Sequence, residues 1–444
     1  MDLNSQYLAK RKTPAEVLAS IQDGDYIFSA QSSSAPVTLI EEMPLLRQWG
    51  RKNLVFNSCG PNYDHAWFHD PAMRDTVEHV SWFFSPPVRK ACQEGLCGFL
   101  PGDTTSLVRK TMDRARWEGR RPVLLATAAP LDAQGNFTLS VSTLFERDLI
   151  NAGALVLLEV SSKHPRICGD TLIPLSRVTA FTETDRPVPA GNPGKAKPVD
   201  QKIAARVAEL IPDGSTLQLG VGHLPNAVAV ELRNRKHLGI HSGVFGYAML
   251  ELIRSGAVDN SQKGFMDGFS ICSSVSGGQD LFDFVDDNHS VLFRAGTFTN
   301  NPRIIAKNRN MVSLNSTLEI DLTGQSAGES MGFRQFSASG AQPETIQGAQ
   351  FSPGGKSILA LPSAYEAKTA DGKRVLQSKI VTSFRPGTVV TSSRTLVDYV
   401  VTEYGTACLR GLSIPRRVEA LIAIAHPEFR EQLRQDAKKY GLLY

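Results

Sequence analysis

The chain lacks any apolar run long enough to cross a bilayer. Its longest apolar runs, such as residues 154–160, have the length of a β-strand. Residues 1–17 also lack the apolar stretch of a secretory signal. We therefore expect a cytoplasmic protein with no membrane partner.

Paired cysteines are also missing. No Cys-x-x-Cys pair occurs among the six cysteines, which are Cys59, Cys92, Cys97, Cys168, Cys272 and Cys408. A scattered set of this kind is typical of reduced, buried thiols. No group of cysteines and histidines has the spacing of zinc ligands, so we expect no metal site.

A strong excess of charge of one sign is absent as well. The 48 Lys and Arg against 44 Asp and Glu give a formal net charge of +4. The sequence has no basic stripe interleaved with aromatic residues, which argues against a nucleic-acid partner. A mild positive balance favours an anionic ligand.

The composition is that of a globular protein, with 41% hydrophobic and 21% charged residues. A length of 444 residues exceeds one ordinary hydrophobic core, so two domains are expected. Residues 186–200, RPVPAGNPGKAKPVD, are rich in Pro, Gly and Lys and form a connecting segment. We predict an N-terminal domain at residues 1–190 and a C-terminal domain at residues 198–444.

Both parts begin with the same order of features: a helix, an Asp-Gly turn, a strand, a loop of small residues and a second helix. The turns lie at residues 23–24 and 213–214, and the second helices are predicted at residues 36–46 and 225–232. The repeat indicates two copies of one α/β unit. Coincidence is the alternative, because Asp-Gly turns are common.

Short apolar runs alternate with amphipathic stretches through the rest of the chain. The predicted strands are residues 123–128, 154–160, 291–293, 357–362 and 387–391, and a helical tail is predicted at residues 414–439. Apolar strands separated by helices favour an α/β fold with a parallel or mixed sheet covered on both faces.

A glycine-rich loop, LQLGVGHLPN at residues 217–226, follows a predicted strand and opens a helix. Glycine lets the backbone approach a ligand closely, and a helix N-terminus favours an anion. A dinucleotide fingerprint is a weaker interpretation, because Pro225 stands where that motif has its third glycine. A simple tight turn is the other alternative.

This loop is one of several segments that together resemble a known family. The others are LGIHSGV (238–244), EIDLTGQSAGES (319–330), SPGGKSILALP (352–362) and VVTEYGTACLRG (400–411). Their order resembles the acetyl-CoA hydrolase/transferase family, the class I CoA-transferases of the 4-hydroxybutyrate type. The resemblance covers nearly the whole chain and is strong after Pro198.

The resemblance implies two related open-sheet CoA-transferase domains with the active-site cleft between them. It also implies that the substrates are an acyl-CoA and a small carboxylate or other acceptor, that coenzyme A is the group handled, and that the protein is a homodimer or homotetramer. The residues that it implies for CoA binding are Gln218, Gly220, Val221, Gly222, Asn226, Gly340, Gln342, Gly354, Gly355 and Lys356. Lys356 would pair with a CoA phosphate, although a Gly-Gly-Lys turn is also an ordinary lead-in to a strand.

The family's catalytic glutamate is missing from its expected place. Where the family usually has LGIHTEMFSDG, this chain has LGIHSGVFGYA, so Gly243 occupies the glutamate position. In the family that carboxylate attacks the thioester and forms a covalent intermediate. Several neighbouring residues differ as well, which indicates a naturally remodelled site.

Other side chains near the motifs are candidates for part of the lost role. His241 would act as a base for water, Tyr247 would bind an acyl carboxylate, and Glu329 would be a supporting carboxylate. A structural role is the alternative for each. Cys59 is a further candidate nucleophile, but a lone cysteine among apolar residues usually belongs to the core.

Three functions follow from this pattern. The first is CoA transfer to a carboxylate, or thioester hydrolysis, by a route without the glutamate. The second is acyl transfer of another type on the same scaffold. The third is non-catalytic binding of acyl-CoA. The retained glycine-rich loop, His241 and the DLTGQ segment favour a working ligand site.

Overall fold

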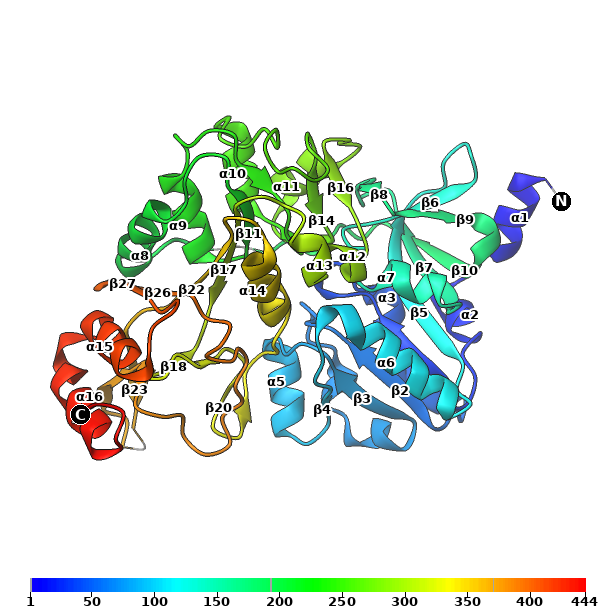
Figure 1. Cartoon of the computed structure of the whole chain (residues 1–444). Helices are drawn as coiled ribbons and strands as arrows, with labels where there is room; N and C mark the ends of the chain where they lie inside the picture. The colour runs from blue at the N-terminus through cyan, green and yellow to red at the C-terminus, as the bar shows by residue number, and fades with distance from the viewer. Residues whose placement is uncertain (1, 192–193, 370) are drawn as a thin grey trace. The chain divides into compact units, whose positions relative to one another are not determined.

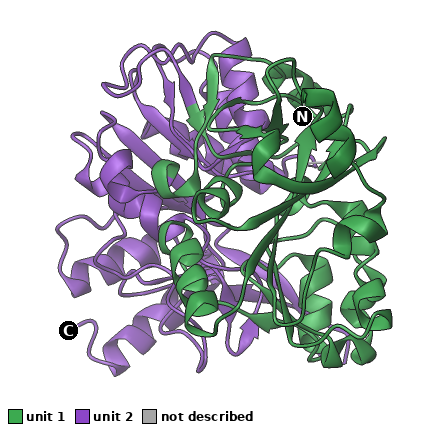
Figure 2. Cartoon of the chain, turned by 90° about the vertical axis from the view of Figure 1, so that its right-hand side faces the viewer, with its two compact units in different colours: residues 1–192, 271–299 green, residues 193–270, 300–444 purple. Residues whose placement is uncertain are grey.

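The computed structural model describes residues 2–191, 194–369 and 371–444 as two open, mainly parallel sheets with helices around them (Figure 1). Residues 1–192 and 271–299 form unit 1, and residues 193–270 and 300–444 form unit 2 (Figure 2). The predicted connecting segment includes residues 192 and 193, which lie outside the described residues. The predicted domain limits, 1–190 and 198–444, stay a prediction. No described helix has both the length and the apolar character needed to span a membrane.

The sheet of unit 1 has nine strands. In order across the sheet, seven of them are β10 (Val178–Thr184), β7 (Leu155–Ser161), β5 (Pro122–Ala129), β1 (Tyr26–Ser29), β2 (Leu54–Ser58), β3 (Val77–Ser81) and β4 (Gly98–Phe99), while β6 (Asn136–Leu139) and β9 (Leu172–Pro174) extend from β5. Alternate residues of β5 enter two separate buried clusters, Leu124 in one and Val123 in the other. Burial on both faces explains the near-continuous apolar sequence of β5 and β7.

Most helices of unit 1 are short. They are α1 (Leu3–Lys10), α2 (Pro14–Leu18), α3 (Val37–Glu41), α4 (Pro44–Gln48), α5 (Pro86–Gln93), α6 (Thr104–Trp117), α7 (Glu146–Asn151), α11 (Gln279–Val285) and α12 (Gly296–Thr299). The single helix predicted at residues 36–46 is wrong, since α3 and α4 are separate. Pro44 has no amide hydrogen to continue α3, and it begins α4 instead.

Residues 271–299 belong to unit 1 because they pair with an earlier segment of it. Strand β16 (Val291–Phe293) runs parallel to β8 (Cys168–Gly169). Gly169 has a φ of 122°, and a Cβ there would collide with the Phe293 carbonyl oxygen, so only glycine fits.

The main sheet of unit 2 has six strands. Their order is β12 (Gly239–Ile240), β11 (Thr216–Leu219), β17 (Met311–Ser316), β22 (Lys356–Ala360), β26 (Tyr399–Thr402) and β27 (Gly405–Cys408). All neighbours are parallel except β26 and β27. The helices are α8 (Pro198–Glu209), α9 (His223–Glu231), α10 (Tyr247–Arg254), α13 (Pro302–Ile305), α14 (Gln342–Phe351), α15 (Ile414–Ile424) and α16 (Pro427–Lys439).

The strands not yet named, among the described residues, are short. They are β13 (Val244–Phe245), β14 (Ser270–Cys272), β15 (Ser274–Val275), β18 (Glu319–Asp321), β19 (Ser326–Ala327), β20 (Ser330–Met331), β21 (Arg334–Gln335), β23 (Ala364–Lys368), β24 (Arg374–Ser378) and β25 (Ile380–Val381). The antiparallel pair β23 and β24 forms a hairpin beyond the main sheet.

The two Asp-Gly turns that were predicted as a repeat form the same hydrogen bonds in both units. Gly24 and Gly214 have φ angles of 78° and 71°, a left-handed conformation that glycine adopts easily. Their amides donate to the carbonyls of Lys52 and Lys236, whose own amides donate to the aspartate before each glycine. Strands β1 and β11, which follow the turns, are interior strands of their parallel sheets. The shared pattern supports duplication of one unit.

Two further predictions differ from the structure. Residues 387–391 form no strand, because Gly387 has a φ of 85° and Val389 and Val390 are exposed, so this segment is a loop despite its β-branched residues. The helical tail is two helices, since α15 ends before Pro427 begins α16. The apolar faces of both helices pack into the core of unit 2.

Candidate active site

Three loops of unit 2 follow neighbouring parallel strands at one edge of the sheet. Residues 220–222 follow β11, residues 241–243 follow β12, and the third loop follows β17, which ends at Ser316. In open parallel sheets, ligands bind at the carboxyl ends of the strands. This edge therefore brings the glycine-rich loop and Gly243 to the same side of the sheet.

The glycine-rich loop leads directly into α9. Gly222 has a φ of 118° and a ψ of −170° and caps the helix, a conformation that residues with a Cβ rarely adopt. Val221 is 52% exposed at the loop tip. The Asn226 amide donates to the Gly222 carbonyl at 3.3 Å, so Asn226 lies in the first turn of α9. The unpaired amides of this first turn suit an anionic ligand.

Gln218 takes part in a buried polar network below this loop. Its Oε1 accepts hydrogen bonds from Ser313 Oγ at 3.0 Å and Asn315 Nδ2 at 3.4 Å. Ser313 Oγ and Asn315 Nδ2 also contact Thr345 Oγ1 of α14, at 2.9 and 3.2 Å. The network joins β11, β17 and α14 and fixes the orientation of Gln218. Its role in binding CoA stays a prediction.

Gly243 lies against the side chain of Asn300. A Cβ built on Gly243 would be 2.8 Å from Asn300 Oδ1 and 3.3 Å from Nδ2. Asn300 is 2% exposed, and its Oδ1 has no hydrogen-bond partner among the described residues. The Asn300 amide thus occupies the space that a side chain at position 243 would enter. Sequence reasoning missed Asn300, because no motif connects these two distant positions.

The segment that contains Gly243 also carries the candidates His241 and Tyr247. His241 is fully buried, and its amide donates to the Leu217 carbonyl at 3.0 Å. Tyr247 is half-buried at the first turn of α10. Asn260 secures β12 from the other side, since its Oδ1 accepts from the Ile240 amide at 2.9 Å. These contacts fix the backbone around Gly243, and the catalytic roles of His241 and Tyr247 stay predictions.

Glu329 and Gln342 both form hydrogen bonds to the segment of residues 391–392. Glu329 is 6% exposed, and its Oε1 accepts a hydrogen bond from Thr391 Oγ1 at 2.9 Å. Gln342, the first residue of α14, donates to Ser392 Oγ at 3.2 Å. Gly340, just before it, has a φ of 53°. The carboxylate of Glu329 thus has a structural partner, and its catalytic role stays a prediction.

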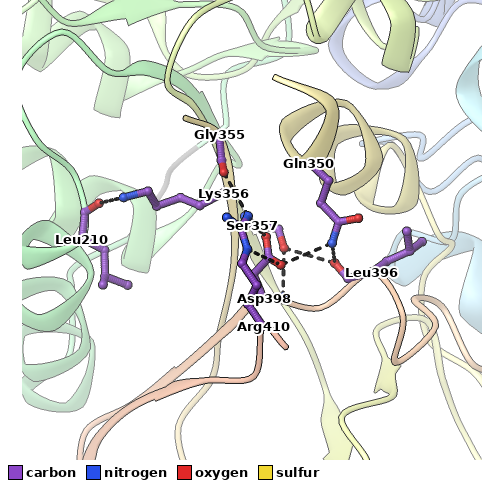
Figure 3. Close-up of polar contacts among 8 residues, drawn as sticks. All are labelled: Leu210, Gln350, Gly355, Lys356, Ser357, Leu396, Asp398 and Arg410. Carbon is purple, nitrogen blue, oxygen red and sulfur yellow. Dashed lines mark hydrogen bonds and ion pairs between the residues drawn. The ribbon is translucent and has the colours of Figure 1, made fainter. Parts of the chain in front are cut away.

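Gly354, Gly355 and Lys356 lie at the opposite edge of the sheet from the glycine-rich loop, because they begin β22 rather than follow it. A Cβ at Gly355 would collide with the Ala349 carbonyl oxygen, so this glycine is needed for the packing of α14. Lys356 Nζ donates to the Leu210 carbonyl at 3.0 Å (Figure 3). The structure does not bring these residues together with Gly220 and Gly222.

Ser357, which follows Lys356 in β22, points to the opposite face of the sheet. Ser357 Oγ donates to the Leu396 carbonyl at 3.2 Å, and Leu396 also accepts from Gln350 of α14 (Figure 3). Adjacent side chains of a strand point to opposite faces. The end of α8 at Leu210 and the helix α14 therefore cover opposite faces of this sheet.

Cys59 of unit 1 is not an activated nucleophile. Burial and the nearby Glu146 carboxylate raise the pKa of the Cys59 thiol to about 12, so it stays protonated at neutral pH. We expect iodoacetamide at pH 8 to modify the exposed Cys408 and to leave Cys59 unmodified in the folded protein, as read by peptide mass spectrometry. Rapid labelling of Cys59 would contradict this expectation.

Among the described residues, Cys168, Asp287 and His289 of unit 1 place one possible metal-ligand atom each within 4.8 Å of one another. Asp287 and His289 are exposed. Exposed groups of this kind are common without a metal, and the expectation of no metal site stays a prediction.

Comparison with protein families gives two matches. Residues 1–209 match the acetyl-CoA hydrolase/transferase N-terminal domain, and residues 277–437 match the acetyl-CoA hydrolase/transferase C-terminal domain. Together these matches cover most of the chain.

Individual relatives match over the full length. The chain is 40% identical to 4-hydroxybutyrate coenzyme A transferase of Clostridium kluyveri over 99% of this chain and 100% of that protein. It is 33% identical to succinyl-CoA:cyclohexane-1-carboxylate CoA transferase of Geobacter metallireducens, over 98% and 96% of the two chains. The crystal structure of RipA from Yersinia pestis matches all of both chains with a TM-score of 0.89 and 31% identity.

Proposed function

The chain belongs to the acetyl-CoA hydrolase/transferase family, and from this premise we propose that it is an enzyme that transfers CoA from an acyl-CoA to a carboxylate, or hydrolyses the thioester. The observation that supports this function most is the 40% identity, over 99% of the chain, to a 4-hydroxybutyrate CoA transferase. The site geometry agrees with it, because the glycine-rich loop and Gly243 lie at the carboxyl edge of one parallel sheet.

The proposed route replaces the missing enzyme carboxylate with the acceptor itself. The acceptor carboxylate attacks the thioester carbonyl, which releases CoA thiolate and leaves a mixed anhydride of the two acids. The thiolate then attacks the acceptor's carbonyl, which gives the new thioester and releases the original acid as a carboxylate. Attack of water on the thioester gives hydrolysis. Gly243 supports this route because it offers no nucleophile.

Asn300 is the residue that we propose to hold the acceptor. Its amide is buried beside Gly243, and an unsatisfied buried polar group costs about 1–3 kcal/mol, which a bound polar ligand offsets. His241 and Tyr247, on the same segment as Gly243, complete the proposed site.

The test is mass spectrometry of the thioesters formed from a panel of acyl-CoAs, with and without carboxylate acceptors. We expect new acyl-CoA species only when a carboxylate is present, with sequential kinetics and no enzyme-bound acyl group. Ping-pong kinetics with a trapped adduct would contradict the direct route. Acylated amines or alcohols, or unchanged thioesters despite binding, would contradict the proposed function.

The assembly follows from the resemblance, the location follows from the sequence, and both belong to the same proposal. We propose a cytoplasmic homodimer or homotetramer. Light scattering coupled to gel filtration would measure the mass in solution against the 48.4 kDa chain.

A further inference from the structure

Strands β8 and β16 of unit 1 bring a cysteine, an aspartate and a histidine together. The two strands run parallel, with Leu292 of β16 opposite Cys168 of β8 (Figure 1). Asp287 and His289 lie in the loop that leads into β16. Cys168, Asp287 and His289 each place one possible metal-ligand atom within 4.8 Å of the others. The fold therefore collects three kinds of metal ligand from segments that are far apart along the chain.

Backbone hydrogen bonds fix the loop before β16 in its position. The Asp287 amide donates to the Arg166 carbonyl at 2.8 Å, and the Arg166 amide donates to Asp286 Oδ1 at 2.7 Å. Within the loop, Asn288 Oδ1 accepts from the Ser290 amide at 3.0 Å. Because Arg166 lies shortly before β8, the two segments that carry the ligands are held together before any ion binds. Such preorganisation lowers the entropy that binding costs.

His289 and Asp287 already have the spacing of two zinc ligands. His289 Nε2 lies 3.5 Å from Asp287 Oδ1. Ligand atoms around a tetrahedral zinc ion are about 3.4–3.6 Å apart, because the zinc–ligand bonds are about 2.0–2.3 Å long. The two side chains are 81% and 79% exposed, so they can turn toward the Cys168 thiol without disturbing the core.

The kinds of ligand select the ion. Zinc binds thiolate, imidazole and carboxylate groups, whereas calcium and magnesium prefer sites made of oxygen alone. Cys168 would bind as the thiolate and release its proton to solvent. Its negative charge and that of Asp287 then balance the two positive charges of the ion. In the part of the chain that the structure describes, the group has no fourth ligand, so water would complete the tetrahedron.

No basic side chain competes with an ion for the Asp287 carboxylate. Within the described ranges, its only ion pair closer than 4.0 Å is the one with His289. The neighbouring residue, Asp286, is exposed and adds a negative charge beside the group. Negative charge of this kind attracts a divalent cation.

We propose that Cys168, Asp287 and His289 bind a zinc ion that ties the loop before β16 to β8. The ion would fasten residues 271–299 to the rest of unit 1, from which this segment is separated along the chain. The site is separate from the predicted CoA-binding residues, which all lie in unit 2. It departs from the expectation of no metal site, which considered only the spacing of ligands along the chain.

Titration of the metal-free, full-length protein with cobalt(II) tests this proposal. A tetrahedral cobalt ion bound to thiolate has strong visible absorption and a thiolate-to-cobalt charge-transfer band in the near ultraviolet. We expect one equivalent to bind with both features, and zinc to abolish them by displacing cobalt. Cys168→Ser should remove the charge-transfer band. Asp287→Asn and His289→Gln should each raise the dissociation constant at least about 100-fold, since loss of an outer partner of a ligand already costs about 10- to 100-fold.

Two exposed groups of unit 2 provide matched controls. His237 Nδ1 lies 2.7 Å from Asp259 Oδ2, and this exposed histidine–aspartate pair has no cysteine at ligand distance among the described residues. Cys408 is an exposed thiol outside any such group in the same ranges. His237→Gln and Cys408→Ser should leave cobalt binding unchanged. Thermal unfolding in the presence of a chelator checks that every variant is folded.

Stability gives a second readout. Zinc at about 100 times its dissociation constant should raise the melting temperature of the wild type by about 5–10 °C and leave that of Cys168→Ser unchanged. A folded wild type without the charge-transfer band, or a band that survives in Cys168→Ser, would overturn the proposal. Equally weak zinc binding by the wild type and His289→Gln would indicate an adventitious ion only, and would overturn it as well.

Discussion

A glutamate placed at position 243 is expected to create a covalent CoA-transferase only when Asn300 is shortened at the same time. In Gly243→Glu alone, the new Cβ lies 2.8 Å from Asn300 Oδ1, a buried contact that requires the amide to move. Overpacking of this kind costs about 1–3 kcal/mol. The single variant should therefore be less stable and show little gain in activity.

The paired variant Gly243→Glu with Asn300→Ala removes that collision. Its carboxylate should attack the thioester, and carboxylate-dependent CoA exchange should exceed that of the single variant by on the order of 10²-fold, equivalent to about 2.7 kcal/mol. Mass spectrometry after incubation with acyl-CoA alone should show an enzyme-bound CoA thioester, with free acid released. Kinetics should change from sequential to ping-pong.

Asn300→Ala by itself is the control for this experiment. This variant opens space without adding a nucleophile, so it should form no adduct. It should also weaken binding of the acceptor, which would appear as a higher KM for the carboxylate. Equal exchange by Gly243→Glu with and without Asn300→Ala would refute the steric argument. Absence of any adduct in a folded paired variant would show that position 243 does not face the thioester.

Loss of Asp398 is expected to destabilise unit 2 by about 1.5–3 kcal/mol, because its buried carboxylate accepts hydrogen bonds from β22 and from the half-exposed Arg410. Its side chain is 5% exposed and accepts from Arg410 at 2.8 and 3.1 Å and from the Ser357 amide at 3.1 Å (Figure 3). Asp398→Ala removes the carboxylate and leaves the Ser357 amide without this partner. The urea midpoint and the melting temperature measure the change.

The matched comparison is an exposed ion pair of the same unit. Glu419 and Arg434 lie 3.2 Å apart with side chains 53% and 42% exposed. Glu419→Ala should cost less than about 1 kcal/mol, since exposed pairs contribute little. A similar loss in both variants would mean that burial does not account for the stability that Asp398 provides. Asp398→Ala combined with Arg410→Ala should cost less than the sum of the two single changes.

Much of the fold was predictable because its signals are local. The apolar run in β7 and the Asp-Gly turns at Gly24 and Gly214 predict strand and turn from neighbouring residues alone. The loop at residues 387–391 shows the limit of such signals. Its valines favour a strand, but Gly387 has a φ of 85° and turns the chain, and the two valines are exposed.

The candidate site was predictable only in part. The sequence placed the glycine-rich loop at a strand end, and the resemblance to a CoA-transferase family is confirmed by both family matches. That Gly243 stands at the position of the family glutamate stays a prediction. The sequence also grouped Lys356 with that loop. The structure separates them, since a residue that begins a parallel strand lies at the opposite edge from one that follows a strand.

The sequence by itself determined the family and the α/β class, because both depend on residues that are adjacent along the chain. The absence of the family glutamate at Gly243 stays a prediction. Only the tertiary structure decided what surrounds Gly243. Asn300 is distant from Gly243 along the chain and lies against it in the folded structure. Such contacts join distant segments, and their geometry arises when the sheet forms and its faces are buried.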